Sequence, residues 1–247
     1  MENSRDHKPI LAIETSTTVA RVAVVDARTG ARLAAAEASA ERHSSNLLRL
    51  CVETTEKARV TIAGLGAIAC GAGPGSFTGL RVGLAVAKGL ALPTDLPLVL
   101  ISSLHALAMD MRPAASPGEW LLPCLDAGKG QVFAALFEVR GADDADGAGG
   151  VLPRGDAWAL APELVPGQLP DDARIVSAGP GAARYQDVLA AGLGTRGRFV
   201  EIAGPSADAV AALALVRLSR GEADDLSTAV PVYGRAPDIT QPRRSPR

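Results

Sequence analysis

The sequence predicts a duplicated α/β fold, and three observations support that prediction. Short apolar runs typical of strands alternate with longer segments of helical periodicity. A strand, an acidic residue, a turn and a second strand follow one another over residues 10–25, and this order returns over residues 121–138, where only the architecture repeats. The stretch 113–118, with two prolines and a glycine, separates the two occurrences and is typical of a linker. A chain of 247 residues is long enough for two lobes that each bury a core.

In the first half, β-rich runs separated by a hydroxyl-rich turn and then by Thr29-Gly30 predict a meander of three strands. A fourth strand leads into a Gly-rich loop, and a fifth follows a helix that stops before Pro93. Ser44 is a suitable N-cap for the first helix, and Ser102 or Ser103 for the third. We expect the strands at 10–13, 21–26, 32–38, 67–70 and 98–101, and the helices at 44–58, 80–92 and 103–111.

In the second half the alternation of strands and helices restarts after the linker. We expect strands at 121–125, 131–138 and 175–177, and helices at 185–191 and 206–220. The stretch 141–150 is rich in Gly, Asp and Ala and is interpreted as a surface loop. The Arg-rich end 242–247 could contact RNA, but a solvated tail is the simpler interpretation.

Composition excludes several classes of protein. The chain has 25 basic and 27 acidic side chains. It therefore lacks the strongly positive potential of a protein that binds nucleic acid without partners. Its three cysteines, Cys51, Cys70 and Cys124, form no CxxC pair and no disulfide framework, which indicates a reducing compartment. The polar residues 1–9 lack the apolar region of a secretory signal, and no long apolar run is free of charge. We therefore expect a cytoplasmic protein without a membrane span.

A Gly-rich loop between the fourth strand and its helix is the most specific local signal. Its backbone N–H groups and two hydroxyls would converge on the positive end of the following helix, which suits an anion. Neither the P-loop pattern nor GxGxxG is present. Alternatively, the glycines serve only to allow positive φ and tight strand-to-helix packing. The candidate anion-contact residues are Gly73, Pro74, Gly75, Ser76, Phe77, Thr78, Gly79 and Arg81.

The helix after this loop carries small residues every four positions. Such a ridge without large side chains lets another helix approach closely. The residues alone leave open whether this helix is buried in the core or lies at a protein–protein interface. The small residues are Gly79, Gly83, Ala87 and Ala91.

No complete catalytic machinery is evident from the sequence. Glu14 and the hydroxyl residues 15–17 form a hairpin corner, which could bind metal and phosphate in a kinase or could be a simple turn. The three histidines, His7, His43 and His105, form no metal-binding motif. Ser76 and Ser177 have no nearby histidine at a recognisable nucleophile elbow.

Several of these segments together resemble the bacterial TsaB (YeaZ) family. The resemblance covers residues 9 to about 236, is strongest in the first half, and is most specific at Gly73–Arg81. Two departures weaken a polar role for the turns: Glu14 stands where the family usually has Asp, and Gly128, Gln131 and Phe133 stand where Arg, Glu and Tyr are usual. The matching segments are Ile10–Ser16, His43-Ser44, Gly73–Arg81, Ala87–Ala91, Ser102–Leu104, Asp126-Ala127 and Pro231–Arg235.

The resemblance implies an actin-like, Hsp70-like (ASKHA) fold of two lobes. Its first lobe would cover 1–112 and its second 119–205. A C-terminal helix and extension over 206–236 would pack back on the first lobe, ahead of a tail at 237–247.

The resemblance also implies a function without catalysis by this chain. Family members act with TsaD and TsaE in making threonylcarbamoyladenosine beside the anticodon of tRNA. The chain would bind and activate a catalytic TsaD-like paralogue together with the ATPase TsaE, and could also pair with itself. It would hold no metal or cofactor of its own, because ATP and metal would lie in the partner subunits, and it would meet tRNA only through the complex.

The implied contact surface consists of helices of the first lobe. The residues expected there are Leu47, Leu48, Cys51, Thr55, Gly79, Gly83 and Ala87. Two rival functions differ in class. A small actin-like kinase or ATPase would work alone through Glu14, Thr15 and the loop 73–79, and a peptidase would need a nucleophile that the sequence does not display.

Overall fold

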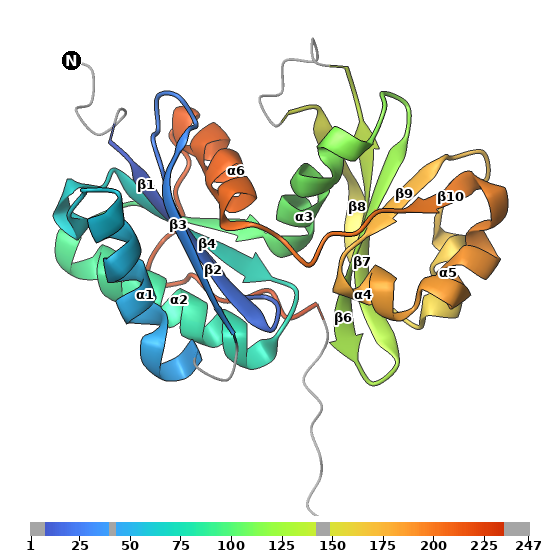
Figure 1. Cartoon of the computed structure of the whole chain (residues 1–247), viewed down its shortest axis with the longest axis horizontal. Coiled ribbons are helices and arrows are strands. Elements are labelled where there is room, and N and C mark those ends of the chain that lie inside the picture. The colour runs from blue at the N-terminus through green and yellow to red at the C-terminus, as the bar shows by residue number, and fades with distance from the viewer. Residues whose placement is uncertain (1–7, 40–42, 142–148, 235–247) are drawn as a thin grey trace, which may run out of the picture.

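The computed structural model describes residues 8–39, 43–141 and 149–234. Within these ranges the chain forms two lobes side by side, each with a five-stranded mixed sheet flanked by helices (Figure 1). The predicted duplicated α/β fold is therefore confirmed. No helix in the described ranges is long and apolar enough to cross a bilayer.

The first sheet has the strand order β3-β2-β1-β4-β5. β1 lies at its centre, antiparallel to β2 and parallel to β4. β1 alternates its side chains between two cores: Leu11 and Ile13 pack under α1 and α2, and Ile10 and Ala12 pack against α6. The strands are β1 Ile10–Glu14, β2 Val19–Val25, β3 Arg32–Ser39, β4 Ala67–Gly73 and β5 Leu98–Ser102, and the helices are α1 His43–Lys57, α2 Phe77–Ala91 and α6 Ala207–Ser219.

The second sheet repeats this topology with the order β10-β9-β6-β7-β8. β6 takes the place of β1, since it is antiparallel to β7 and parallel to β9. α3 covers one face of this sheet, and α4 and α5 cover the other. The strands are β6 Trp120–Gly128, β7 Gln131–Val139, β8 Val151–Leu160, β9 Ile175–Ala178 and β10 Gly197–Phe199, and the helices are α3 Ser103–Met111, α4 Pro180–Arg184 and α5 Gln186–Leu193.

Outside the two strand–acid–turn–strand segments, the repeat also includes a short sequence. Ala-Gly-Pro-Gly closes β4 as residues 72–75, and the same four residues follow from the last residue of β9 as residues 178–181. The first glycine of each copy, Gly73 and Gly179, has a φ of +102°. A side chain at either glycine would strike a neighbouring carbonyl oxygen, so each position needs glycine.

Two strands, one short helix and one helix start differ from the prediction. The short helix is α4, which precedes the helix expected at 185–191. β8 and β10 were not expected, and the sequence of β8 explains its omission: Pro153 and Gly155 are poor strand formers, and much of the strand is exposed. α2 begins at Phe77 rather than residue 80, because Ser76 caps it by accepting a hydrogen bond from Gly79 N. Most of the predicted loop 141–150 and the whole tail 237–247 lie outside the described residues.

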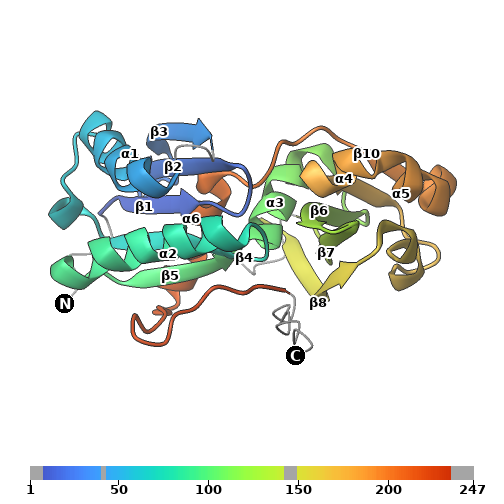
Figure 2. The same cartoon turned by 90° about the horizontal axis from the view of Figure 1, so that it is seen from below.

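After α6 the chain returns along the first lobe as an extended segment, residues 222–234, which we name the C-terminal strap. It runs beneath β5 and ends between the lobes (Figure 2). Asp224 N donates to Leu98 O, and Leu100 N donates to the Asp224 carboxylate, so the strap seals the edge of the first sheet. Arg217 of α6 donates to Leu100 O and to Asp224, which completes this seal.

Candidate functional site

The corner between β1 and β2 is filled by the protein's own groups. Glu14 is fully buried, and its Oε1 accepts a hydrogen bond of 2.6 Å from Ser16 N. Its Oε2 accepts one of 2.9 Å from Ser103 Oγ at the start of α3. Ser103 Oγ in turn accepts from Gly73 N, so one acid ties the corner to α3 and to the Gly-rich loop. Gly71 closes the other side, since a Cβ there would lie 2.1 Å from Glu14 Oε2.

Burial dominates the electrostatics of this corner. It raises the pKa of Glu14, although the hydrogen bonds from Ser16 and Ser103 act in the opposite direction. The neighbouring hydroxyls of Thr15 and Ser16 are buried, and neither has a hydrogen-bond partner among the described residues. Thr15 is enclosed by α2, where a Cβ at Gly83 would lie 2.2 Å from Thr15 Oγ1. A phosphate or metal would have to displace these contacts before it could reach the acid.

The Gly-rich loop is fitted closely onto the same corner. Ser76 N donates a hydrogen bond of 2.7 Å to Ser16 O. A Cβ at Gly75 would lie 2.4 Å from Ser16 O, and one at Gly79 would lie 2.1 Å from Thr15 O. These distances support the interpretation that the glycines serve close packing. The anion contact at residues 73–79 and Arg81 stays a prediction.

The strap meets this loop although the two segments are far apart in sequence. Arg81 Nε donates 2.9 Å to the hydroxyl of Tyr233, and the Arg81 guanidinium lies 3.8 Å from the centroid of the Phe77 ring. The rings of Phe77 and Tyr233 are 4.9 Å apart. Val232 N donates 2.7 Å to Ala72 O. Both segments resemble the family in sequence, but no sequence pattern indicates that they are in contact.

The structure corrects most of the residues chosen for the partner surface. Their helical spacing marks one face of each helix, but that face packs on the first sheet. Gly83 faces Thr15, and Ala87 belongs to the core cluster under α1 and α2. Leu48 alone among the seven is exposed. The six buried residues are Leu47, Cys51, Thr55, Gly79, Gly83 and Ala87.

A different set of small and apolar residues faces outward on α1 and α2. Leu48 is 52% exposed, and Ala85 and Gly89 are exposed one turn apart on α2. Val52, Val82 and Val86 are half-buried on the same helices, and Val82 and Val86 also pack against the core of the first sheet. We name this set the outer face of α1 and α2: Leu48, Val52, Val82, Ala85, Val86 and Gly89.

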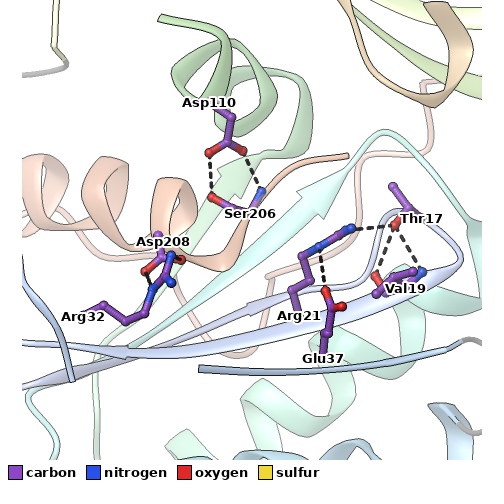
Figure 3. A network of polar contacts seen from close by, with 8 residues as sticks. All are labelled: Thr17, Val19, Arg21, Arg32, Glu37, Asp110, Ser206 and Asp208. Carbon is purple, nitrogen blue, oxygen red and sulfur yellow. Dashed lines mark hydrogen bonds and ion pairs between the residues drawn. The ribbon is translucent and has the colours of Figure 1, made fainter. Parts of the chain in front are cut away.

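A polar network holds the lobes where the chain crosses between them (Figure 3). Both carboxylate oxygens of Asp110, near the end of α3, accept hydrogen bonds of 2.7 Å from Ser206 N and Ser206 Oγ. Ser206 is the N-cap of α6, so this contact joins α3 to the start of α6, where the chain has returned to the first lobe. Arg32 forms a paired hydrogen bond with Asp208 in the first turn of α6, which fixes α6 to β3. Burial raises the pKa of Asp110.

The described residues provide little for catalysis. They contain no group of three or more His, Cys, Asp or Glu side chains that could hold a metal ion. The acid of the second hairpin, Asp126, is paired with Arg184 at 2.6 Å. The His105 ring contacts Val151 O rather than a nucleophile. Burial raises the pKa of Cys51 and Cys124 to about 12, which keeps both thiols protonated at neutral pH.

Comparisons with known proteins agree with this structure. The family model "TsaD: tRNA N6-adenosine threonylcarbamoyltransferase" matches residues 35–197. The tRNA threonylcarbamoyladenosine biosynthesis protein TsaB of Escherichia coli is 32% identical over 136 residues, which is 52% of this chain and 54% of that protein. YeaZ from Pseudomonas aeruginosa superposes with a TM-score of 0.76 at 27% identity, covering 92% of this chain and 99% of that one. The chain belongs to the TsaB family.

Further TsaB relatives match shorter segments. TsaB of Haemophilus influenzae is 37% identical over 99 residues, 40% of this chain and 41% of that protein. The chain thus spans about half the length, or less, of the curated TsaB proteins it matches. A second Pseudomonas aeruginosa structure, described as similar to peptidase YeaZ, has a TM-score of 0.74 at 26% identity, covering 92% of this chain and 100% of that one. The expected fold of two lobes agrees with these YeaZ structures.

Proposed function

We propose that the chain is a non-catalytic subunit in the synthesis of threonylcarbamoyladenosine on tRNA. The names of its TsaB relatives and the match to a TsaD-type family model support this reaction and the kinship with a catalytic paralogue. Its task is to bind and activate that TsaD-like paralogue.

The filled hairpin corner carries the non-catalytic part of the proposal. In an actin-like enzyme that works alone, the acid at this corner must reach metal and phosphate. Here Glu14 is enclosed by Ser16, Ser103 and Gly71, and its raised pKa disfavours the charge that a metal would need. The acid of the second hairpin, Asp126, is held by Arg184. Both acidic corners thus serve the chain's own structure.

The outer face of α1 and α2 is the proposed contact with the paralogue. Small residues on α2, Ala85 and Gly89, would let a partner helix approach closely, and Leu48 would supply an apolar anchor. An interface of this kind gains its free energy from apolar burial at a few central residues. The same face would serve for pairing with a second copy of the chain.

The remaining parts of the proposal concern the other components. ATP and metal would be held by the TsaD-like and TsaE-like subunits, and tRNA would be bound through the assembled complex. The protein would act in the cytoplasm. A chain with a formal net charge of −2 is suited to a role in which other subunits supply most of the grip on RNA.

Size-exclusion chromatography with light scattering, using the TsaD-like paralogue of the same organism, tests this proposal. The wild-type chain should form a complex with it, and Leu48→Asp should lose the complex while its circular dichroism is unchanged. Leu164→Asp is the matched control, because Leu164 is 57% exposed but lies in the second lobe. A folded Leu48→Asp variant that binds as tightly as wild type would refute this surface.

The alternative function, a kinase or ATPase that acts alone, is tested by ATP binding to the same purified protein. A kinase or ATPase acting alone should bind ATP without the paralogue, as measured by calorimetry. If the chain binds ATP and never associates with the paralogue, the actin-like kinase function replaces the accessory one.

A further inference from the structure

The C-terminal strap is anchored on the first lobe by three kinds of contact. Its Val232 N–H donates to Ala72 O at the end of β4. The Tyr233 hydroxyl accepts a hydrogen bond from Arg81, and its ring lies against Phe77. Arg81 in turn covers the Phe77 ring, so Phe77, Arg81 and Tyr233 form one stacked set.

The last described residue of the strap lies between the lobes. A Cβ at Gly234 would lie 2.9 Å from the Pro74 Cβ of the first lobe and 3.0 Å from the Phe133 ring of the second. Gly234 also has a φ of +62°, which favours glycine at this position. The strap is therefore in contact with both lobes, although its anchors belong to the first.

This contact lies apart from the connection through which the chain returns from the second lobe to the first. The chain passes to the second lobe where β5 ends at Ser102 and α3 begins at Ser103, and it returns over residues 200–206. The pair Asp110–Ser206 joins α3 to the start of α6. In Figure 2 the returning connection, in orange, runs along the upper side of the molecule, whereas the strap runs along the lower side. The strap therefore adds a contact between the lobes to those made by α3 and by the returning connection. Each such contact opposes rotation of one lobe against the other.

We propose that the C-terminal strap is a built-in clamp that fixes the two lobes of this chain relative to each other. The Phe77–Arg81–Tyr233 set anchors the clamp, and Gly234 carries it to Pro74 and Phe133. In a two-lobed protein that closes on a ligand, the ligand itself bridges the lobes. Here a segment of the same chain makes the bridge. The clamp goes beyond the proposed function, because it acts in the free protein whether or not the paralogue binds.

Distance measurements between spin labels on the two lobes test the clamp. The double variant Ala85→Cys, Leu164→Cys places one exposed thiol on each lobe. Cys51, Cys70 and Cys124 are buried, and their raised pKa values keep them unreactive toward the label. With the strap intact, we expect one narrow distance distribution.

Three substitutions in this labelled background separate the clamp from general stability. Tyr233→Ala should broaden the distribution and make the Val232 amide exchange about tenfold faster or more. Tyr233→Phe keeps the ring and loses only the Arg81 hydrogen bond. It should therefore broaden the distance distribution and speed Val232 amide exchange, but less than Tyr233→Ala does. Val230→Ala is the control: Val230 is 66% exposed in the same strap and should leave the distribution unchanged.

The outcomes are distinct from those of the complex-formation test. If Tyr233→Ala is folded by circular dichroism and keeps the narrow distribution, the clamp is refuted. If Tyr233→Ala fails to fold, Tyr233→Phe decides in its place: an unchanged distribution and unchanged Val232 exchange refute the clamp. A broad distribution already present in the wild-type chain also refutes it. None of these results depends on the paralogue.

Discussion

Gly71 lies directly against Glu14, at a distance that leaves no room for a methyl group: a Cβ at Gly71 would lie 2.1 Å from Glu14 Oε2. The carboxylate cannot withdraw freely, since Ser16 and Ser103 hold it on the other sides. Gly71→Ala should therefore lower the free energy of unfolding by about 1–3 kcal/mol. Urea denaturation measures this loss. Gly89→Ala is the control, because Gly89 is an exposed helical glycine with open space around it and should gain up to about 1 kcal/mol.

Stability should depend on pH through Glu14. Because burial raises its pKa, the folded chain binds this proton more tightly than the unfolded chain does. The resulting stabilisation is complete below the ordinary pKa of 4.5 and is lost as the pH rises through the raised value. Glu14→Gln has no such loss, so the free energy of unfolding of the variant minus that of wild type should increase from pH 4.5 to neutral pH. A difference that stays flat over this range would contradict the burial argument.

Substitutions on α2 should be tolerated on its exposed side but not on the side that faces Thr15. Gly83→Ala places a methyl group 2.2 Å from the buried Thr15 Oγ1 and should cost about 1–3 kcal/mol in the free energy of unfolding. Gly83→Arg should therefore fail to fold and cannot report on binding. Ala85→Arg, two residues along and exposed, should change stability by no more than about 0.5 kcal/mol. Thermal unfolding of the three variants checks this order, and a stable Gly83→Arg would show that α2 can move away from β1.

The hydrogen bonds of Asp224 at the edge of β5 should contribute more to the free energy of unfolding than an exposed ion pair does. In Asp224→Ala the Leu100 N–H loses its acceptor and Arg217 loses a partner, which should cost about 1–3 kcal/mol. Glu222→Ala removes only an exposed pairing with Arg217 and should cost about 1 kcal/mol or less. Urea denaturation compares the two, and equal losses would mean that the backbone contact contributes nothing beyond the ion pair.

Most of the fold could be predicted because its elements are short and regular. Apolar runs bounded by Gly, Pro and Ser place the first five strands to within a few residues, and the repeated strand–acid–turn–strand order indicates two lobes. β8 escaped prediction because Pro153 and Gly155 interrupt it and its edge position leaves it exposed. β10 has only three residues, too few for any periodicity.

The candidate site was harder to predict, because burial depends on tertiary contacts. Helical spacing shows that Leu47 and Leu48 lie on apolar sides of one helix, but it cannot show that Leu47 faces the sheet and Leu48 the solvent. Likewise, the glycines of α2 predict a close approach without naming the approaching group. That group is Thr15 of the same chain. The contact of Tyr233 with Arg81 joins residues 152 positions apart, and no local pattern encodes it.

The packing of α6 on the first sheet has a consequence for synthesis on the ribosome. Ile10 and Ala12 of β1 share their core with Val210 and Ala211, so the first lobe lacks one of its layers until nearly the whole chain has emerged. The core between the second sheet and its helices α4 and α5 draws only on residues from 122 to 193 in its buried cluster, all of which precede α6. The first lobe's other core, under α1 and α2, draws on residues 11–98 apart from Ala229 and emerges earlier. The nascent chain can therefore complete the second lobe while the first still lacks its α6 layer, so the N-terminal lobe is the last to be completed.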